Sequence, residues 1–202
     1  QIKKHTTIVG QGYVGLTLSI FMAEKRAVIN AYDRNKDLIK NLNNDQIPFY
    51  ELGIKNKLIK CKKNNTLNFS SSLNKDMNKV IIICVGTPVV NKKIVYNNLL
   101  SSFDAVSKII KKNSLIIMRS TIPLGSSKKI LIPYLEKKTK LKCGTDWNYI
   151  FAPERTIEGN ALKELKLLPQ LVAGYSKNCI NKGLKFLKLF FEDVVELENL
   201  EA

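Results

Sequence analysis

The sequence contains few of the residues that metal sites and disulfide scaffolds require. Its 202 residues include one histidine and four cysteines, and no two cysteines form a CxxC pair. A metal site is therefore not expected. We interpret Cys61, Cys84, Cys143 and Cys179 as reduced and non-catalytic; Cys84 lies inside the apolar run 80–85, which is typical of a buried structural thiol.

Long apolar runs are also absent. No stretch approaches the roughly 20 apolar residues that a membrane-spanning helix needs, and no signal-peptide core follows residues 1–4. We therefore expect a cytoplasmic protein with no membrane partner. Hydrophobic residues make up 45% and charged residues 25% of the chain, which is typical of a folded domain and excludes a disordered or fibrous protein.

Arginine is scarce although the chain is strongly basic. The formal net charge is +16, but only four of the 33 basic residues are arginine. Such a charge attracts nucleic acid, anionic membranes or phosphate-bearing ligands alike. Proteins that read bases concentrate arginine and aromatic residues on one face, whereas these lysines are spread along the whole chain. Specific nucleic-acid binding is not expected, although a non-catalytic nucleotide-binding or nucleic-acid-binding module remains an alternative.

The chain does contain a regular alternation of short apolar runs with longer amphipathic stretches. This pattern predicts repeated βαβ units and a parallel sheet. Strands are expected over residues 5–10, 28–33, 66–69, 80–85, 114–120, 149–153, 171–174 and 194–197. Helices are expected over residues 13–25, 36–43, 52–62, 99–112, 125–140, 161–167 and 177–191. We predict a single α/β domain with a mainly parallel, doubly wound sheet of the Rossmann type, helices on both of its faces, and least regular structure over residues 91–98.

A glycine-rich string lies between the first expected strand and the first expected helix. It reads GQGYVG over residues 10–15, and this context makes GxGxxG indicative of a dinucleotide-binding loop. Gly10 permits the tight turn, Gly12 lets the backbone approach a pyrophosphate, and Gly15 lets the helix pack closely on the sheet. The pyrophosphate would lie on unpaired amides at the positive end of the helix.

Asp33 ends the second apolar run, 18 residues after Gly15. A carboxylate at that place accepts hydrogen bonds from the adenosine ribose hydroxyls and repels a 2′-phosphate, which favours NAD over NADP as the cofactor. Arg34 follows directly and could stack on the adenine or hold a 2′-phosphate. Asp33 could instead cap the helix that begins near Asn35.

Three further segments lie where strands are expected to end, and ligands of open parallel sheets gather at such ends. They read CVGTP over residues 84–88, RSTIPLGS over 119–126 and FAPERTIEGNAL over 151–162. Together with the glycine loop they resemble the UDP-glucose/GDP-mannose dehydrogenase family, in order and in spacing. The last string is similar to the branch that acts on UDP-N-acetylhexosamines, particularly UDP-N-acetylmannosamine; UDP-glucose and GDP-mannose enzymes remain alternatives.

The resemblance implies a reaction and a set of catalytic residues. Enzymes of this family oxidise the 6-position alcohol of a UDP-sugar or GDP-sugar twice, reduce two NAD, and pass through an enzyme-bound thioester. The resemblance places Thr121 beside the nicotinamide and a catalytic water. It implies that Glu154 is the base or the group that orients that water, and that Glu158 is a second carboxylate. Thr121 could otherwise cap a helix, and Glu154 could lie in a solvated loop.

The resemblance also assigns binding residues. Val85, Gly86 and Thr87 are expected near the cofactor ribose and pyrophosphate, and Tyr13 and Val14 are expected to add cofactor contacts. Arg155 and Leu165, with Glu154 and Glu158, are expected to bind the sugar nucleotide. Glu51, in YELG over residues 50–53, is a weak helix-start or site-adjacent signal.

Other residues that the family uses have no counterpart in this sequence. The nucleophilic cysteine and the catalytic lysine and asparagine lie in later segments of family members. We therefore expect residues 1–202 to be a single NAD-binding domain of a longer enzyme, with an incomplete UDP-sugar pocket and little or no turnover. The longer enzyme is expected to be a homodimer or a larger assembly, and this part a monomer or a weak dimer.

Overall fold

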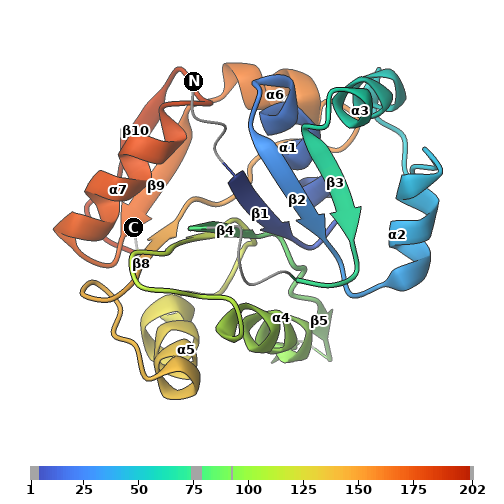
Figure 1. Cartoon of the computed structure of the whole chain (residues 1–202). Coiled ribbons are helices and arrows are strands. Elements are labelled where there is room, and N and C mark those ends of the chain that lie inside the picture. Colours follow the sequence, from blue (N-terminus) through green and yellow to red (C-terminus); the bar gives the residue numbers. More distant parts are fainter. Residues whose placement is uncertain (1–4, 74–78, 92, 201–202) are drawn as a thin grey trace.

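A computed structural model describes residues 5–73, 79–91 and 93–200. Within these ranges eight strands form one sheet, in the order β10-β9-β8-β7-β4-β1-β2-β3 (Figure 1). The strands of this sheet are β1 (His5–Val9), β2 (Val28–Tyr32), β3 (Leu67–Ser70), β4 (Val80–Ile83), β7 (Leu115–Met118), β8 (Asn148–Phe151), β9 (Gln170–Gly174) and β10 (Val194–Glu196). A separate hairpin joins β5 (Val89–Val90) to β6 (Lys93–Ile94).

The direction of the strands places a crevice in the middle of the sheet. The six strands from β3 to β8 run parallel to their neighbours, whereas β9 is antiparallel to β8 and parallel to β10. The connections after β1 and after β4 leave toward opposite edges, because β1 lies between β2 and β4 while β4 lies between β1 and β7. Ligands of such sheets bind at this reversal, outside the carboxyl ends of the strands.

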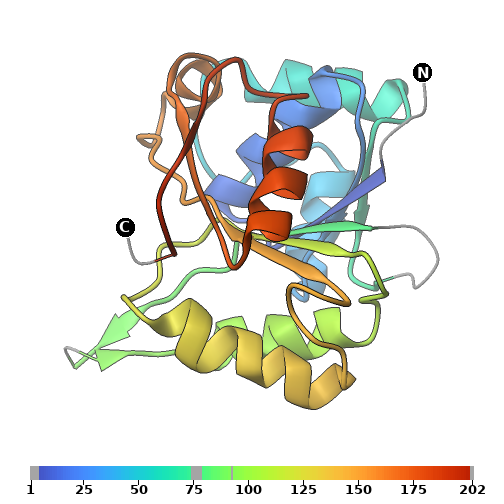
Figure 2. The ribbon, with the colours of Figure 1, turned by 90° about the vertical axis from the view of Figure 1, so that its left-hand side faces the viewer.

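Helices cover both faces of the sheet. In the described residues they are α1 (Tyr13–Glu24), α2 (Lys36–Asn43), α3 (Ile54–Lys63), α4 (Asn97–Ser107), α5 (Ile132–Thr139), α6 (Ala161–Leu167) and α7 (Lys177–Leu187). With the sheet seen nearly edge-on in Figure 2, α4 and α5 lie on one side and α1, α3, α6 and α7 on the other. The expected α/β Rossmann-like fold is thereby confirmed.

Each face of the sheet has its own hydrophobic core, because successive strand residues point to opposite faces. On β1, Ile8 packs with α1 and α3, whereas Val9 belongs to the cluster of α4 and α5. On β4, Ile82 faces the first cluster, and Ile81 and Ile83 face the second. The strands are therefore buried on both sides, which explains why their sequences are continuous apolar runs rather than alternating ones.

The structure departs from the expected elements in several places; α7, for example, ends four residues before its expected end at residue 191. The stretch expected to be least regular, residues 91–98, contains β6 and the first two residues of α4. Helix α4 ends five residues before its expected end at residue 112. The helix expected over residues 125–140 is divided into a π-helical segment (Ser127–Leu131) and α5. Pro133 stands at the junction, where it has no N–H for the regular ladder.

The described helices do not meet the requirements for crossing a membrane. None of them combines the length and the apolar composition that a bilayer crossing requires.

Candidate functional site

The glycine loop joins β1 to α1, and its three glycines have different surroundings. Gly10 has a φ of +90°, and a Cβ atom there would lie 2.7 Å from the carbonyl oxygen of Cys84. A Cβ atom on Gly15 would lie 1.8 Å from the carbonyl oxygen of Gly10, so α1 packs too closely for any side chain. Gly12 has no heavy atom within 4 Å of the corresponding position. The fold therefore requires Gly10 and Gly15, whereas the space at Gly12 is open.

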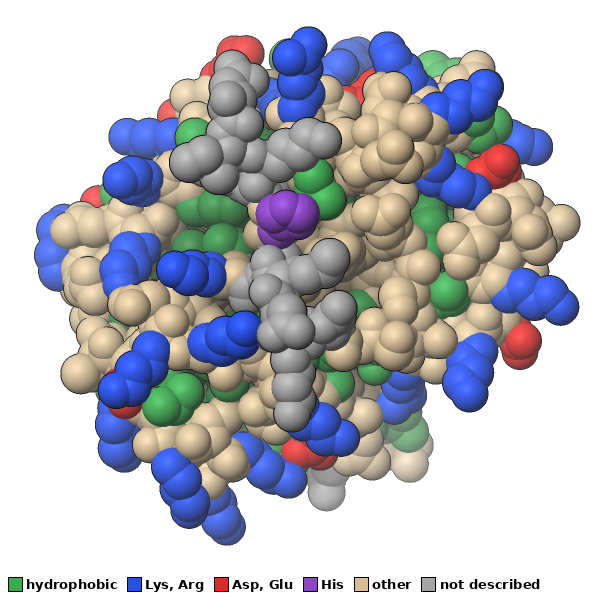
Figure 3. Space-filling view, viewed as in Figure 1, with side chains coloured by type: hydrophobic (Ala, Val, Ile, Leu, Met, Phe, Trp, Pro, Cys, Tyr) green, Lys and Arg blue, Asp and Glu red, His purple; other side chains and the backbone are tan. Residues whose placement is uncertain are grey.

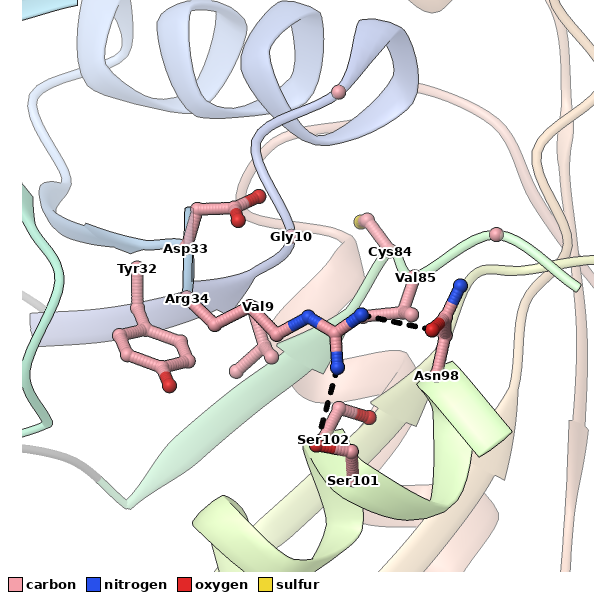
Figure 4. A pocket seen from close by; sticks show the side chains of 12 residues that line it. Val9, Gly10, Tyr32, Asp33, Arg34, Cys84, Val85, Asn98, Ser101 and Ser102 are labelled. Carbon is pink, nitrogen blue, oxygen red and sulfur yellow. Dashed lines mark hydrogen bonds between the residues drawn. The ribbon is translucent and has the colours of Figure 1, made fainter. Parts of the chain in front are cut away.

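A pocket of about 230 Å³ lies at the crevice between β1 and β4 (Figure 4). Its wall is formed by the ends of β1, β2 and β4 together with the first turns of α4. Six of the predicted cofactor residues line it: Gly10, Gly12, Asp33, Arg34, Val85 and Gly86. The structure thus brings together residues that lie up to 76 positions apart in the sequence.

Asp33 connects the glycine loop to the segment after β2. One oxygen of its carboxylate accepts the backbone N–H of Gln11 at 2.8 Å, and the other accepts the N–H of Asn35 at 2.9 Å. Each carboxylate oxygen has a further lone pair, so the group can still accept a hydroxyl. Asn35 is the residue that caps α2, through its own side chain. Asn35 rather than Asp33 therefore caps α2, and Asp33 lines the pocket.

Arg34 extends away from Asp33 and crosses the pocket to α4 (Figure 4). Its Nη2 donates to Oδ1 of Asn98 at 2.8 Å, and its Nη1 donates to Oγ of Ser101 at 3.4 Å. The guanidinium of Arg34 therefore has defined partners on the opposite wall of the pocket.

The polar groups around the pocket suit the adenosine half of a dinucleotide. No side chain among the described residues caps the N-terminus of α1, and the space at Gly12 beside it is open. Unpaired amides at the positive end of a helix bind phosphate. Asp33 has the acceptors that a ribose needs, at the neighbouring strand end. These groups would hold the pyrophosphate and the ribose of NAD.

The ends of β4 and β7 are tied together beside this pocket. The hydroxyl of Thr87 donates to the backbone carbonyl of Thr121 at 2.7 Å. The next strand end is joined in a similar way, because the N–H of Glu154 donates to the carbonyl of Arg119 at 3.0 Å. The side chain of Thr121 is exposed at this edge. The three segments that carry the family resemblance therefore meet at one edge of the sheet.

Glu154 forms a buried ion pair with Arg119, which sequence reasoning did not single out. The Arg119 side chain is 2% exposed and the Glu154 side chain 9%, and Arg119 also donates to Oε1 of Gln170 at 2.7 Å. The second oxygen of Glu154 accepts the N–H groups of Arg155 and Thr156. Burial alone would raise the pKa of Glu154, but Arg119 and these amides outweigh it, so the pKa lies below its ordinary value.

Glu51 fastens the same loop from the opposite side. Its carboxylate is 5% exposed, accepts the Tyr13 hydroxyl, and accepts the N–H of Leu162 in the first turn of α6 at 3.1 Å. The Tyr13 hydroxyl in turn accepts the N–H of Gly159 at 2.7 Å. Burial, followed by the bond to Glu51, raises the pKa of Tyr13 to about 12. Glu51 is thus adjacent to the site and caps α6 rather than the helix that follows it.

The remaining predicted residues lie further from the pocket. Val14 is half-buried against the core, and Leu165 is 1% exposed, so Leu165 could reach a substrate only through its backbone. Arg155 is exposed, and its guanidinium donates to the carbonyl of Pro169. Glu158 is exposed on the loop between Glu154 and α6.

Sequence reasoning missed Arg119, Asn98 and Ser101. A signal existed for Arg119, because it is a single basic residue directly after the apolar run 115–118. Asn98 and Ser101 are three residues apart, which places them on one face of a helix. Their partner could not be recognised, because Arg34 lies on another element more than 60 residues away.

The cysteines provide no nucleophile at this edge. All four are free and buried. Cys84 lines the pocket, but burial raises the pKa of its thiol to about 12. A thiol with such a pKa is protonated at neutral pH and is a poor nucleophile.

Basic side chains are dispersed on the visible surface. On the face shown in Figure 3, lysines and arginines are spread over the view and are more frequent on its left side.

Comparison with known proteins identifies the family of the chain. A family model described as the NAD-binding domain of the UDP-glucose/GDP-mannose dehydrogenase family matches residues 4–192. The chain belongs to this family. The family's domain binds NAD, which confirms the predicted cofactor.

The most similar relatives differ in substrate. A UDP-N-acetyl-D-mannosamine dehydrogenase from Pyrococcus horikoshii is 28% identical over 194 residues, which cover 95% of this chain and 46% of that protein. A UDP-glucose 6-dehydrogenase from Rickettsia typhi is 30% identical over 198 residues, covering 90% and 44%. The solved UDP-N-acetyl-mannosamine dehydrogenase from Staphylococcus aureus has a TM-score of 0.91 at 26% identity, covering 98% and 48%. The chain spans slightly less than half the length of these relatives.

Proposed function

We propose that this chain is the NAD-binding domain of a nucleotide-sugar 6-dehydrogenase that oxidises a UDP-N-acetylhexosamine, with UDP-N-acetylmannosamine as the first candidate, to its uronic acid. The observation that carries the cofactor role is the open space at Gly12 beside the uncapped N-terminus of α1 and the carboxylate of Asp33. The string at residues 153–162 and the relatives from Pyrococcus and Staphylococcus support the acetylated sugar. The relative from Rickettsia supports UDP-glucose as the second candidate.

In this proposal the strand ends supply the groups that handle protons and water. NAD accepts hydride from the sugar when it is bound. The exposed Thr121 hydroxyl, at the end of β7, can both donate and accept a hydrogen bond to water or to the substrate alcohol. Glu158, exposed on the next loop, is available to the sugar nucleotide, and Arg155 is exposed three positions before it.

Glu154 is better suited to orienting a water than to removing its proton. Its lowered pKa makes it a weak base, and both of its oxygens already accept hydrogen bonds. A carboxylate held in this way keeps a fixed direction for its remaining lone pairs. We therefore assign it the orienting role among the two that the family resemblance implies.

Calorimetric titration of the chain with NAD and with NADP tests the cofactor role. We expect NAD to bind more tightly than NADP, and Asp33→Ala to weaken NAD binding by about tenfold, as expected for a hydrogen-bonded charged group. Asp37→Ala is the matched control, because Asp37 is an exposed carboxylate in the first turn of α2. Equal binding of NAD by both variants would contradict the assignment of Asp33.

Identifying the substrate requires an assay of the longer enzyme. UDP-N-acetylmannosamine, UDP-glucose and GDP-mannose are compared by the NADH formed, and the preferred substrate should yield two NADH for each uronic acid. We expect residues 1–202 alone to give no uronic acid and to be a monomer or a weak dimer, with the longer enzyme forming a homodimer or a larger assembly. Turnover by residues 1–202 would contradict the domain assignment.

A further inference from the structure

Arg34 is the one cation among the described residues that line the NAD pocket. It lies next to Asp33 in the sequence, and a free guanidinium at this place could reach a phosphate on the ribose. A guanidinium binds phosphate with two parallel hydrogen bonds and at close range. Its position therefore bears on whether the pocket accepts the 2′-phosphate of NADP.

The structure holds this guanidinium on the far wall of the pocket. Asn98 is the second residue of α4 and Ser101 follows three positions later, so both side chains lie on the helix face toward the pocket. Asn98 and Ser101 accept hydrogen bonds from two different nitrogens of Arg34, at 2.8 and 3.4 Å respectively. The carboxylate of Asp33, in contrast, points toward the glycine loop and accepts the N–H of Gln11 (Figure 4).

We propose that Asn98 and Ser101 form a tether that makes this pocket selective for NAD over NADP, by holding Arg34 on α4 and leaving Asp33 as the charged group at the ribose. The inference deepens the NAD-binding role and depends on it. Asn98 and Ser101 are positioning residues in this proposal, because they act through Arg34. An exposed hydrogen bond of this kind contributes little to folding, so its effect should be seen in ligand selectivity and not in thermal stability.

The ratio of the dissociation constant of NADP to that of NAD measures the effect of the tether on selectivity. In Asn98→Ala we expect this ratio to fall by about tenfold, since one hydrogen bond to a charged group no longer restrains Arg34. Ser102→Ala is the matched control. Ser102 also lines the pocket, but its hydroxyl donates to the carbonyl of Leu99 at 2.6 Å within α4. The ratio in Ser102→Ala should equal that of the unaltered chain.

A double variant shows whether Asn98 acts through Arg34. In an Arg34→Ala background, Asn98→Ala should leave the ratio unchanged, because no guanidinium remains to be released. A fall of the same size in that background would overturn the proposal, as would an unchanged ratio in Asn98→Ala alone.

ADP-ribose and its 2′-phosphorylated form provide a second measurement that needs only the adenosine half of the pocket. The same fall in their ratio is expected in Asn98→Ala. If the unaltered chain binds neither NAD nor ADP-ribose, the NAD-binding role fails and the tether fails with it. If it binds both while Asn98→Ala leaves both ratios unchanged, the tether alone is wrong.

Discussion

Two regions at the carboxyl edge of the sheet use their polar groups in opposite ways. In the NAD pocket, Gly12 is open, α1 has no side-chain cap among the described residues, and Asp33 can accept further hydrogen bonds. In the segment 153–162, which we call the fastened loop, Glu154 accepts hydrogen bonds from Arg119 and from two backbone amides. Glu51, outside this segment, accepts hydrogen bonds from Tyr13 and from the amide of Leu162. The pocket keeps its hydrogen-bonding capacity for a ligand, and the fastened loop uses its capacity on itself.

This difference separates binding from stability. Changes in the fastened loop should act on the free energy of unfolding, because they leave buried groups without partners. Changes at the open positions of the pocket should act on NAD affinity alone. The fluorescence of the single, buried Trp147 can follow unfolding and so measure the free energy of unfolding.

Gly15→Ala should have the largest effect. The added Cβ atom would lie 1.8 Å from the carbonyl oxygen of Gly10, so α1 must move away from β1. We expect a loss of about 4 kcal/mol or more in the free energy of unfolding, measured by urea denaturation. A stable variant with unchanged urea midpoint would show that α1 is not packed as described.

Arg119→Met should follow, because it leaves the Glu154 carboxylate buried without its partner. We expect a loss of about 3 kcal/mol in the same measurement. The double variant Arg119→Met with Glu154→Gln removes both charges and should recover part of this loss. Glu158→Gln, on an exposed residue of the fastened loop, controls for the removal of one carboxylate. A double variant no more stable than Arg119→Met would contradict the ion pair as the cause.

The pH dependence of stability should report the same ion pair with a smaller effect. The pKa of Glu154 is lowered in the folded chain from its ordinary value of 4.5. A lowered pKa contributes stability that is present above 4.5 and is lost as the pH falls through the folded value. Glu154→Gln should therefore show a shallower fall in melting temperature than the unaltered chain as the pH is lowered below 4.5. Parallel curves for the two proteins would contradict the lowered pKa.

How far the sequence predicts this molecule depends on the range of the interactions involved. The eight sheet strands follow from apolar runs, and the glycine loop follows from its place between a strand and a helix, since both signals are local. The division of the helix at Pro133 also has a local cause and could have been predicted.

The fastened loop and the Arg34 tether could not be predicted in this way. Glu51 caps a helix that begins 110 positions later, and Arg34 meets Asn98 across 64 positions. Residue type alone gives Glu51 or Arg119 several possible partners, and only the order of the strands selects among them. Charged side chains that join distant elements are therefore where the structure adds most to the sequence.

Gly12→Ala should have the smallest effect on unfolding and a large effect on binding. Nothing lies within 4 Å of the new Cβ atom, and the backbone at Gly12 is extended with a φ of −67°, which alanine adopts freely. Alanine is a poorer N-cap than glycine, but it also restricts the unfolded chain, so we expect a net change within about 1 kcal/mol. The methyl group would, however, occupy the space where the pyrophosphate approaches α1, and NAD affinity should fall by more than about tenfold. The same substitution three residues away, at Gly15, should strongly destabilise the fold, so the pair divides one glycine motif into a position for the ligand and a position for the fold. Unchanged NAD affinity in a folded Gly12→Ala variant would place the pyrophosphate elsewhere.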